Sequence, residues 1–439
     1  MKRILSLLIA SVMVIGILTS CQAPGEGTDR VAIAGDYVEA FIDQDYRELG
    51  SFSLTFRMRW SLNNRVYRTI KDQLFQEFGE FIEVSEVEET VSGEYYIVRH
   101  ICRFTGGYGN INVVFDGKNR IAGLNYTFNK TYKEDDESID VLFGREYTLP
   151  GSMIVPSAEN PVPAVIIVHG SGPSDRNGEF GGNAVYFDIA QKLAEKGIAS
   201  LRYDKRTYVY QDPDDYDMAT FTVYDETIDD VVSVFEFLCL QPGIDPNGIY
   251  IIGHSLGGYL IPRIAREIPD AKGFIMLAPN ASPIEDLMIV QTEYIYGLDG
   301  RISKTEQNTI DSIAETAEII RHLAPGDTYE SSELLNAPVS YWLDLRDYNP
   351  LFEIGGIKRP VLIVHGERDY QVNRTEYELW HSSVIALDNV ESVLLPGLNH
   401  MFAYGTEASK PQEYYKLSEV DSSVIDLISE FIGENQYGD

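Results

Sequence analysis

The sequence predicts two domains, a small α+β domain followed by a larger α/β domain built on a doubly wound, mostly parallel sheet. Between about residues 29 and 130, helical periodicity gives way to strand periodicity, which is typical of an α+β fold. From about residue 140, solid apolar runs alternate with amphipathic helices, which is typical of a parallel sheet covered on both faces. The 439 residues, 44% hydrophobic and 23% charged, have an ordinary globular composition and are enough for two cores.

The first 20 residues have the pattern of an export signal. Lys2 and Arg3 precede the apolar run Ile4–Leu18, which is short for a membrane span but typical of a signal peptide. The run ends in Leu-Thr-Ser-Cys at Cys21, which resembles the bacterial lipoprotein box. The resemblance implies that Cys21 is lipidated and anchors the exported protein, either on the outer side of the cytoplasmic membrane or in the outer membrane. An ordinary secretory peptide is the alternative.

Charge and cysteine content exclude several classes of protein. Acidic residues outnumber basic ones by 68 to 35, and a net charge of −33 disfavours nucleic-acid binding. Besides Cys21 there are only Cys102 and Cys239, too few for a disulfide framework, and both are predicted to be buried apolar residues. The seven histidines show no metal-ligand spacing.

The predicted α+β domain follows a short tether at residues 21–28. Apolar spacing predicts two helices and then three strands, and the Asp-Gly pair at Asp116 is typical of a hairpin turn. A charged linker is expected at 131–139. The expected elements are helices over Val31–Leu49 and Arg65–Phe81, and strands over Glu94–Phe104, Asn110–Phe115 and Arg120–Phe128.

The second domain is predicted to span 140–439. Its strands are expected over Ala164–Val168, Ile198–Tyr203, Ile249–Ile252, Gly273–Leu277, Pro360–Val364 and Val390–Leu395. Its helices are expected over Ala184–Lys196, Asp225–Leu240, Leu256–Glu267, Arg374–Leu387 and Val420–Phe431. The alternation stops at about 283–350, where a polar, helical stretch is predicted to form an inserted cap.

A glycine-rich turn between a predicted strand and helix carries a candidate nucleophile. From Gly253 to Gly258 the sequence reads Gly-His-Ser-Leu-Gly-Gly. A serine in such a sharp turn projects its hydroxyl beyond the sheet, and its neighbours must be small because a Cβ would clash. Ser255 is therefore the predicted nucleophile.

A serine nucleophile needs a base, and the base needs an acid that orients it. The next-to-last predicted strand is followed by Asp369, with Glu367 as the alternative acid, and the last strand is followed by His400. The order Ser255, Asp369, His400 is that of a catalytic triad whose members follow successive strand ends.

The oxyanion of such a reaction needs two backbone N–H groups. One is expected from Leu256, the residue after the serine. The other is expected from the loop His169–Pro173, which follows the first buried strand. Ser171 is the candidate donor, with Gly172 as the alternative, because the glycines of this loop allow the backbone a close approach.

These motifs resemble those of bacterial carboxylesterases with the α/β-hydrolase fold, over about two-thirds of the chain. The four motifs are His-Gly-Ser-Gly-Pro at 169–173, Gly-His-Ser-x-Gly-Gly at 253–258, Gly-Glu-Arg-Asp-Tyr-Gln-Val at 366–372 and Gly-Leu-Asn-His at 397–400. The family's Asp-x-Arg turn is also present, and Asp204 and Arg206 are interpreted as structural. The stretch at 29–130 resembles a domain of unknown function with a cone-like, ketosteroid-isomerase-like fold, without an acid–base pair to transfer.

The resemblance implies ester hydrolysis through an acyl-enzyme, with a small-molecule ester as substrate and with no metal or organic cofactor. Tyr341, Trp342 and Tyr348, near the end of the cap, are candidates for lining the acyl pocket, and the alternative is that they belong to a core. A serine peptidase or acylpeptidase, or a thioesterase, on the same fold is an alternative. A binding lipoprotein that uses an inert hydrolase fold is the alternative from another class.

Overall fold

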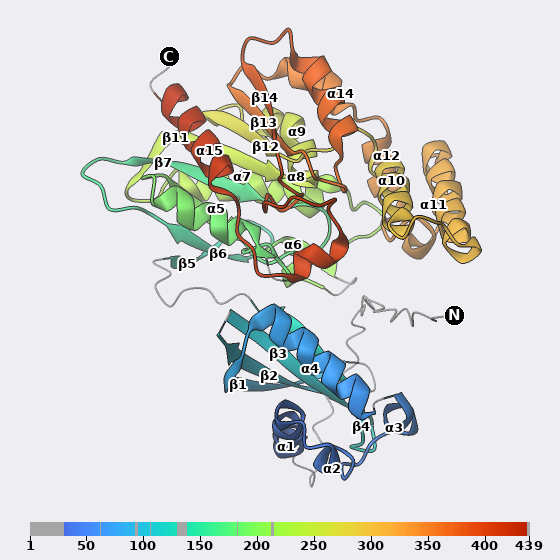
Figure 1. Cartoon of the computed structure of the whole chain (residues 1–439). Helices are drawn as coiled ribbons and strands as arrows, with labels where there is room; N and C mark the ends of the chain where they lie inside the picture. Colours follow the sequence, from blue (N-terminus) through green and yellow to red (C-terminus); the bar gives the residue numbers. More distant parts are fainter. Residues whose placement is uncertain are drawn as a thin grey trace. The chain divides into compact units, whose positions relative to one another are not determined.

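The structure of the protein is a computed structural model, which describes residues 30–61, 63–92, 95–105, 107–129, 138–181, 183–211 and 215–436. The chain divides into two compact units, which we call unit 1 (Met1–Thr131) and unit 2 (Tyr132–Asp439) (Figure 1). The expected signal peptide, Cys21 and the tether lie outside the described residues, as do residues 131–137 of the expected linker.

Unit 1 is an antiparallel sheet with helices that precede it in the chain. The helices are α1 (Arg30–Asp43), α2 (Tyr46–Leu49), α3 (Phe56–Ser61) and α4 (Asn64–Phe78). The strands, in the order β1-β2-β3-β4, are β1 (Phe81–Ser92), β2 (Tyr95–Phe104), β3 (Gly107–Phe115) and β4 (Ile121–Asn129). Residues from α1, α4 and the strands form one core, which includes Tyr37, Leu74 and Val113.

Unit 2 is built on an eight-stranded sheet in the order β14-β13-β12-β11-β7-β10-β6-β5. The two strands β5 and β6 are antiparallel to their neighbours, and the other pairs are parallel. The strands are β5 (Ile139–Phe143), β6 (Leu149–Ile154), β7 (Val162–Val168), β10 (Ala199–Tyr203), β11 (Ile244–His254), β12 (Gly273–Leu277), β13 (Val361–Gly366) and β14 (Val390–Leu395). A short hairpin pairs β8 (Glu179–Phe180) with β9 (Asn183–Ala184).

Helices cover both faces of this sheet (Figure 1). Alternate residues along each central strand belong to two separate cores, because successive side chains of a strand point to opposite faces. One core includes α5 and α15, and the other includes α7 and α9. The α-helices of unit 2 are α5 (Val185–Ala194), α6 (Arg206–Val209), α7 (Asp229–Leu238), α8 (Leu256–Tyr259), α9 (Ile261–Glu267), α10 (Ile284–Gly297), α11 (Lys304–His322), α12 (Val339–Arg346), α13 (Pro350–Glu353), α14 (Arg374–Val384) and α15 (Ser422–Asn435).

The mostly parallel, doubly wound sheet confirms the predicted fold class of unit 2. Between β12 and β13 the chain forms α10 to α13, where the sequence predicted a cap. The predicted helix over Asp225–Leu240 begins instead as a π-helix, η2 (Tyr224–Ile228), and continues as α7. The short helices that the structure describes in full also include the 3₁₀ turns η3 (Ser331–Glu333), η4 (Ile354–Gly356) and η5 (Pro411–Tyr415).

Five strands of the structure were missing from the prediction, namely β1, β5, β6 and the two strands of the short hairpin, β8 and β9. Strand β1 lies at the edge of its sheet, and its acidic side chains hide the apolar alternation. Strand β5 is also an edge strand and is mostly exposed, and its partner β6 contains Pro150 and Gly151, which are depleted in strands. The long predicted helix Val31–Leu49 is broken at Gln44, which has a φ of 58°.

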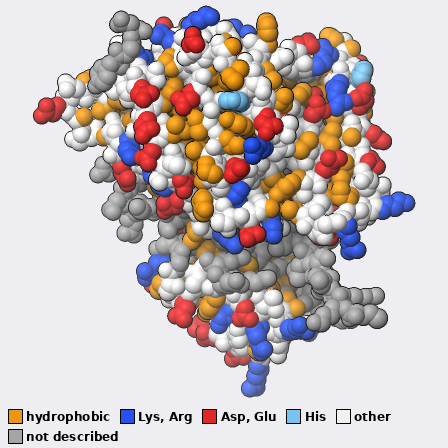
Figure 2. Space-filling view, turned by 45° about the horizontal axis from the view of Figure 1, so that its top comes forward, with side chains coloured by type: hydrophobic (Ala, Val, Ile, Leu, Met, Phe, Trp, Pro, Cys, Tyr) orange, Lys and Arg blue, Asp and Glu red, His pale blue; other side chains and the backbone are white. Residues whose placement is uncertain are grey.

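Both described cysteines are free thiols, Cys102 buried and Cys239 half-buried. Among the described residues, no helix combines the length and the apolar character needed to cross a membrane. On the face seen in Figure 2, acidic and basic side chains are interspersed among apolar ones.

Candidate active site

Ser255 lies in a strained turn between β11 and α8. Its φ of 54° and ψ of −118° fall in a region that side-chain-bearing residues seldom adopt. The turn is held at its start by the hydrogen bond from the Ser255 N–H to the carbonyl oxygen of Leu277, at 2.8 Å. Such a conformation is expected where a side chain must be presented at a functional site.

The glycines around Ser255 are required by close packing. A Cβ at Gly253 would lie 2.4 Å from the carbonyl oxygen of Gly257, and a Cβ at Gly257 would lie 2.5 Å from the carbonyl oxygen of His169. Both distances are too short for real atoms, so no other residue fits without moving the backbone. The prediction that these two glycines remove clashing Cβ atoms is confirmed.

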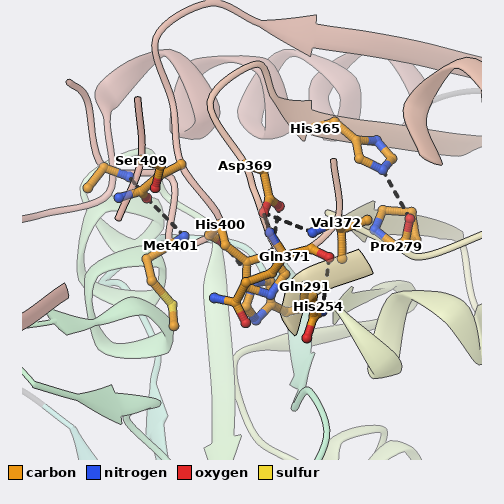
Figure 3. Close-up of polar contacts among 12 residues, drawn as sticks. His254, Pro279, Gln291, His365, Asp369, Gln371, Val372, His400, Met401 and Ser409 are labelled. Atoms are coloured by element: carbon orange, nitrogen blue, oxygen red, sulfur yellow. Dashed lines mark hydrogen bonds and ion pairs between the residues drawn. The ribbon is translucent and has the colours of Figure 1, made fainter. Parts of the chain in front are cut away.

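The structure brings Asp369 to His400 through a hydrogen bond of 2.6 Å between Oδ2 and Nδ1 (Figure 3). Both side chains are almost fully buried. The other carboxylate oxygen of Asp369 accepts the backbone N–H groups of Gln371 and Val372, at 2.7 and 2.9 Å. Glu367, the alternative acid, is instead half-exposed and lies 3.6 Å from Arg374.

His254, just before Ser255, links the loops of the site. The Tyr186 hydroxyl accepts the N–H of Gly170 at 3.0 Å. It donates its own hydrogen to His254 Nδ1, at 3.2 Å, because the carbonyl oxygen of His400 can only accept and so requires the hydrogen of the neutral ring on Nε2. His254 Nε2 then donates to the carbonyl oxygen of His400, at 3.0 Å. The rings of His254 and His400 lie 4.8 Å apart, which places the proposed base beside the residue that precedes Ser255.

Burial keeps His254 neutral. Burial, with a smaller contribution from the neighbouring His400, lowers the pKa of His254 to about 3. A neutral imidazole has one acceptor nitrogen, which here accepts from the Tyr186 hydroxyl, and one donor nitrogen, which here donates to the His400 carbonyl oxygen. Nothing in the sequence indicated that Tyr186 contacts the site. Its place in a predicted helix suggested only an aromatic residue packed against the sheet.

The loop after β7 lies against the nucleophile. A Cβ at Gly170 would be 3.2 Å from the Cβ of Ser255 and 3.7 Å from its hydroxyl oxygen. Gly170 is therefore the close approach that the sequence predicted for this loop. Its own N–H is occupied by Tyr186, which leaves Ser171 and Gly172 as the candidate donors on this loop. Gly172 has a φ of 78°, which favours glycine.

Leu256 begins α8, and the first N–H groups of a helix lack intrahelical partners. Leu256 therefore stays the other candidate oxyanion donor, beside the loop after β7. The four motifs thus come together at the carboxyl edge of the sheet, from the ends of β7, β11, β13 and β14.

Asp204 and Arg206 have the structural contacts that the sequence predicted. Asp204 accepts the backbone N–H of Arg176 at 2.8 Å and pairs with its guanidinium, also at 2.8 Å. Arg206 pairs with the buried Asp230 at 2.5 Å. Lys205 between them contacts the loop after β7, which the sequence analysis missed.

Of the two roles that the sequence left open for three aromatic residues near the end of the cap, pocket or core, the structure supports the core. Tyr341, Trp342 and Tyr348 are buried in the core that covers one face of the sheet. Each also makes an internal hydrogen bond: Tyr341 to Glu226, Trp342 to the Leu334 carbonyl and Tyr348 to the Tyr259 carbonyl. Aromatic spacing alone does not distinguish a pocket from a core.

Cap helix α10 contacts the loops that carry Asp369 and His400. The Gln291 side chain donates to the carbonyl oxygen of Gln371 at 2.9 Å, and the Tyr294 hydroxyl donates to that of Ser409 at 2.8 Å. The rings of Tyr294 and Tyr370 are stacked at 5.1 Å. Within the part of the chain that the structure describes, no group of three or more His, Cys, Asp or Glu side chains is arranged to hold a metal ion.

Comparison with known proteins identifies the family. Residues 165–417, more than half of the chain, match the alpha/beta hydrolase family. The chain belongs to this family. The family match covers the loop after β7, the Ser255 turn, Asp369 and His400.

This hydrolase also resembles individual esterases. It is 34% identical over 380 residues to esterase EstD of Thermotoga maritima, covering 85% of this chain and 87% of that protein. Among solved structures, Est1E of Butyrivibrio proteoclasticus is 18% identical, with a TM-score of 0.44 over 68% of this chain and 99% of its own. The Pyrococcus furiosus esterase Pf2001 is 18% identical, with a TM-score of 0.45 over 70% and 96% of the two chains.

Proposed function

We propose that this hydrolase cleaves carboxylic esters through Ser255, His400 and Asp369. The observation that carries the proposal is the buried Asp369–His400 hydrogen bond beside the strained turn of Ser255. The 34% identity to an esterase over most of both chains supports esters as the substrate class.

In the proposed mechanism, His400 takes the proton of Ser255 as the hydroxyl attacks the ester carbonyl. Asp369 accepts the Nδ1 hydrogen of His400, which leaves Nε2 free to act as the base, and it stabilises the imidazolium that forms. The N–H groups of Leu256 and Ser171 bind the oxyanion. His400 then protonates the leaving alcohol, and water repeats the cycle on the acyl-enzyme.

The test is hydrolysis of p-nitrophenyl esters from acetate to palmitate by the protein and by Ser255→Ala. The variant is expected to lose nearly all activity and to keep its circular dichroism spectrum. Ser312→Ala, on the exposed face of α11, is the matched control and should keep the full rate.

Each other outcome has a defined meaning. A Ser255→Ala variant that kept its rate would refute the nucleophile. Turnover of thioesters or peptides in place of esters would change the proposed substrate class but leave the assignment of Ser255, His400 and Asp369 unchanged. If no substrate were turned over and a fluorophosphonate failed to label Ser255, the hydrolase fold would be inert and the binding-protein alternative would hold.

We also propose that the protein is exported and lipidated at Cys21. The support is the charged start, the apolar run and the Leu-Thr-Ser-Cys sequence. Two or more acyl chains anchor a protein firmly, which the strongly acidic chain could not achieve by charge attraction. Metabolic labelling with an alkynyl palmitate should mark the full chain and Cys239→Ser, but not Cys21→Ser. Label retained by Cys21→Ser would contradict the anchor.

A further inference from the structure

Lys205 is a buried cation directly behind the loop that carries the proposed oxyanion donor. It follows β10, and only 1% of its side chain is exposed. Its ammonium donates to the carbonyl oxygen of Gly170 at 2.8 Å and to Glu226 Oε1 at 2.5 Å. No step of the proposed mechanism uses this group.

The hydrogen bond from Lys205 to the Gly170 carbonyl acts on the same peptide group that carries the Ser171 N–H, the proposed oxyanion donor. The carbonyl of Gly170 and the N–H of Ser171 belong to the same planar amide, so fixing the oxygen also fixes the direction of the N–H. A hydrogen bond donated to an amide oxygen polarises the amide and strengthens its N–H as a donor. The N–H of Gly170 is held by Tyr186, so this residue is hydrogen-bonded on both sides.

The surroundings of Lys205 fit a fixed charge. A buried ammonium is costly unless it is paired and hydrogen-bonded. Glu226 provides the pair, and the Tyr341 hydroxyl donates to its other carboxylate oxygen at 2.8 Å. Glu226 lies in the π-helix η2, a rare local structure that is frequent at functional sites.

We propose that Lys205 is a positioning residue of the oxyanion hole, which orients and polarises the Gly170–Ser171 amide so that Ser171 N–H stabilises the tetrahedral intermediate. The inference rests on the proposed function. Glu226 and Tyr341 hold the ammonium in place, so the end of the cap is joined to the oxyanion hole through α12.

The test is Lys205→Met, which removes the ammonium and keeps the apolar stem. The kcat for the best p-nitrophenyl ester should fall about 10- to 100-fold while KM changes less than threefold. The expected loss is smaller than the 10²–10³ caused by removing an oxyanion donor, because the N–H remains. The inhibition constant of an alkyl trifluoromethyl ketone, whose adduct carries the oxyanion, should rise by the same factor as kcat/KM falls.

Three further variants separate this role from structural damage. Lys205→Met/Glu226→Gln removes both buried charges, so it keeps the test available if Lys205→Met alone does not fold, and it should show the same kcat loss. Lys205→Arg keeps a cation and should recover part of the rate. Lys192→Met is the control, since Lys192 on α5 donates to the Val420 carbonyl at 2.6 Å and pairs with Glu419 at 3.1 Å, and both partners lie outside the loop after β7. Its kcat should be unchanged.

Two results would overturn the inference. One is a folded Lys205→Met, or the folded double variant, whose kcat and inhibition constant stay within twofold of the unsubstituted protein. The other is a rise in KM with kcat unchanged, which would place Lys205 in ground-state binding. Inactive Ser255→Ala with fully active Lys205→Met would refute this inference alone, whereas active Ser255→Ala would refute the proposed function itself.

Discussion

At the scale of single residues, the hydrogen-bond partners of each polar group in the site fix which atom of that group is available to the next residue. Asp369 Oδ1 is occupied by two backbone N–H groups, so only Oδ2 is directed to His400. His254 is held neutral between Tyr186 and the His400 carbonyl. The site is therefore ordered before any substrate arrives, which is what electrostatic catalysis requires.

Asp369→Asn is predicted to lower kcat about 10⁴-fold with the fold intact. The backbone donors hold the amide oxygen of the new side chain, so its NH₂ group faces His400 Nδ1. That nitrogen must then become an acceptor, which puts the hydrogen on Nε2 and leaves no base for Ser255. The measurement is kcat for the best p-nitrophenyl ester, with Glu367→Gln as the control that should retain its rate. A larger loss in Glu367→Gln than in Asp369→Asn would reassign the acid.

Sequence alone predicted the residues that follow strand ends, and it missed those whose partners come from other elements. Ser255, Asp369 and His400 could be named because parallel strands bring their carboxyl ends to one edge. Lys205 also follows a strand, but its proposed positioning role depends on hydrogen bonds to Gly170 and Glu226, which lie next to it only in the folded chain. Tyr186 gave no signal for the same reason.

At the scale of elements, the turn between β11 and α8 packs so closely against the end of β7 that a Cβ atom at Gly257 does not fit. Gly257→Ala is predicted to destabilise the protein by about 3 kcal/mol or more, because its Cβ would meet two backbone oxygens at 2.5 and 2.8 Å. Gly433→Ala is the matched control in α15, where a Cβ meets nothing within 4 Å, and it should stabilise by about 0.5–1 kcal/mol. Urea unfolding measures both. Equal effects would contradict the packing argument.

Elements with one buried face and regular spacing were predictable, and edge elements were not. Strands β7, β12 and β13 are fully buried apolar runs, and each was predicted within two residues at either end. Strands β1 and β5 lie at sheet edges, where an exposed strand has no regular alternation of buried apolar and exposed polar residues. In β1 the acidic side chains interrupt the alternation, and in β5 apolar residues such as Leu142 are themselves exposed.

At the scale of the whole molecule, three buried histidines make folding dependent on pH. Burial lowers the pKa of His169 and His254 to about 3 and that of His365 to about 4, against an ordinary 6.5. Below pH 6.5 the unfolded chain binds protons that the folded chain does not. The stability that these residues contribute is therefore fully present above pH 6.5 and is lost as the pH falls, towards 4 for His365 and towards 3 for His169 and His254.

When the pH falls from 6.5 to 5, each of these histidines is predicted to lower the free energy of unfolding by about 2 kcal/mol. Urea unfolding at several pH values measures the slope. His365→Gln, whose amide can still donate to the Pro279 carbonyl that His365 contacts (Figure 3), should show a shallower slope by about one proton. Parallel curves for the two proteins would show that His365 is not a source of the acid sensitivity.

The strand order of unit 2 could not be read from the sequence, although the parallel sheet could. In the sheet β7 lies between β10 and β11, so the loop after β7 meets both Lys205 and Ser255. Periodicity identifies strands but does not say which strands are neighbours. Contacts between loops that depend on that order were therefore outside what the sequence predicted.

The position of β13 and β14 after β11 in the chain has a consequence for biosynthesis. The ribosome makes the chain from its N-terminus, so Ser255 emerges long before Asp369 and His400. A nascent or prematurely terminated chain that stops before residue 400 contains the proposed nucleophile without its base. We expect such a product to turn over esters far more slowly, so the proposed activity arises only in chains translated beyond residue 400.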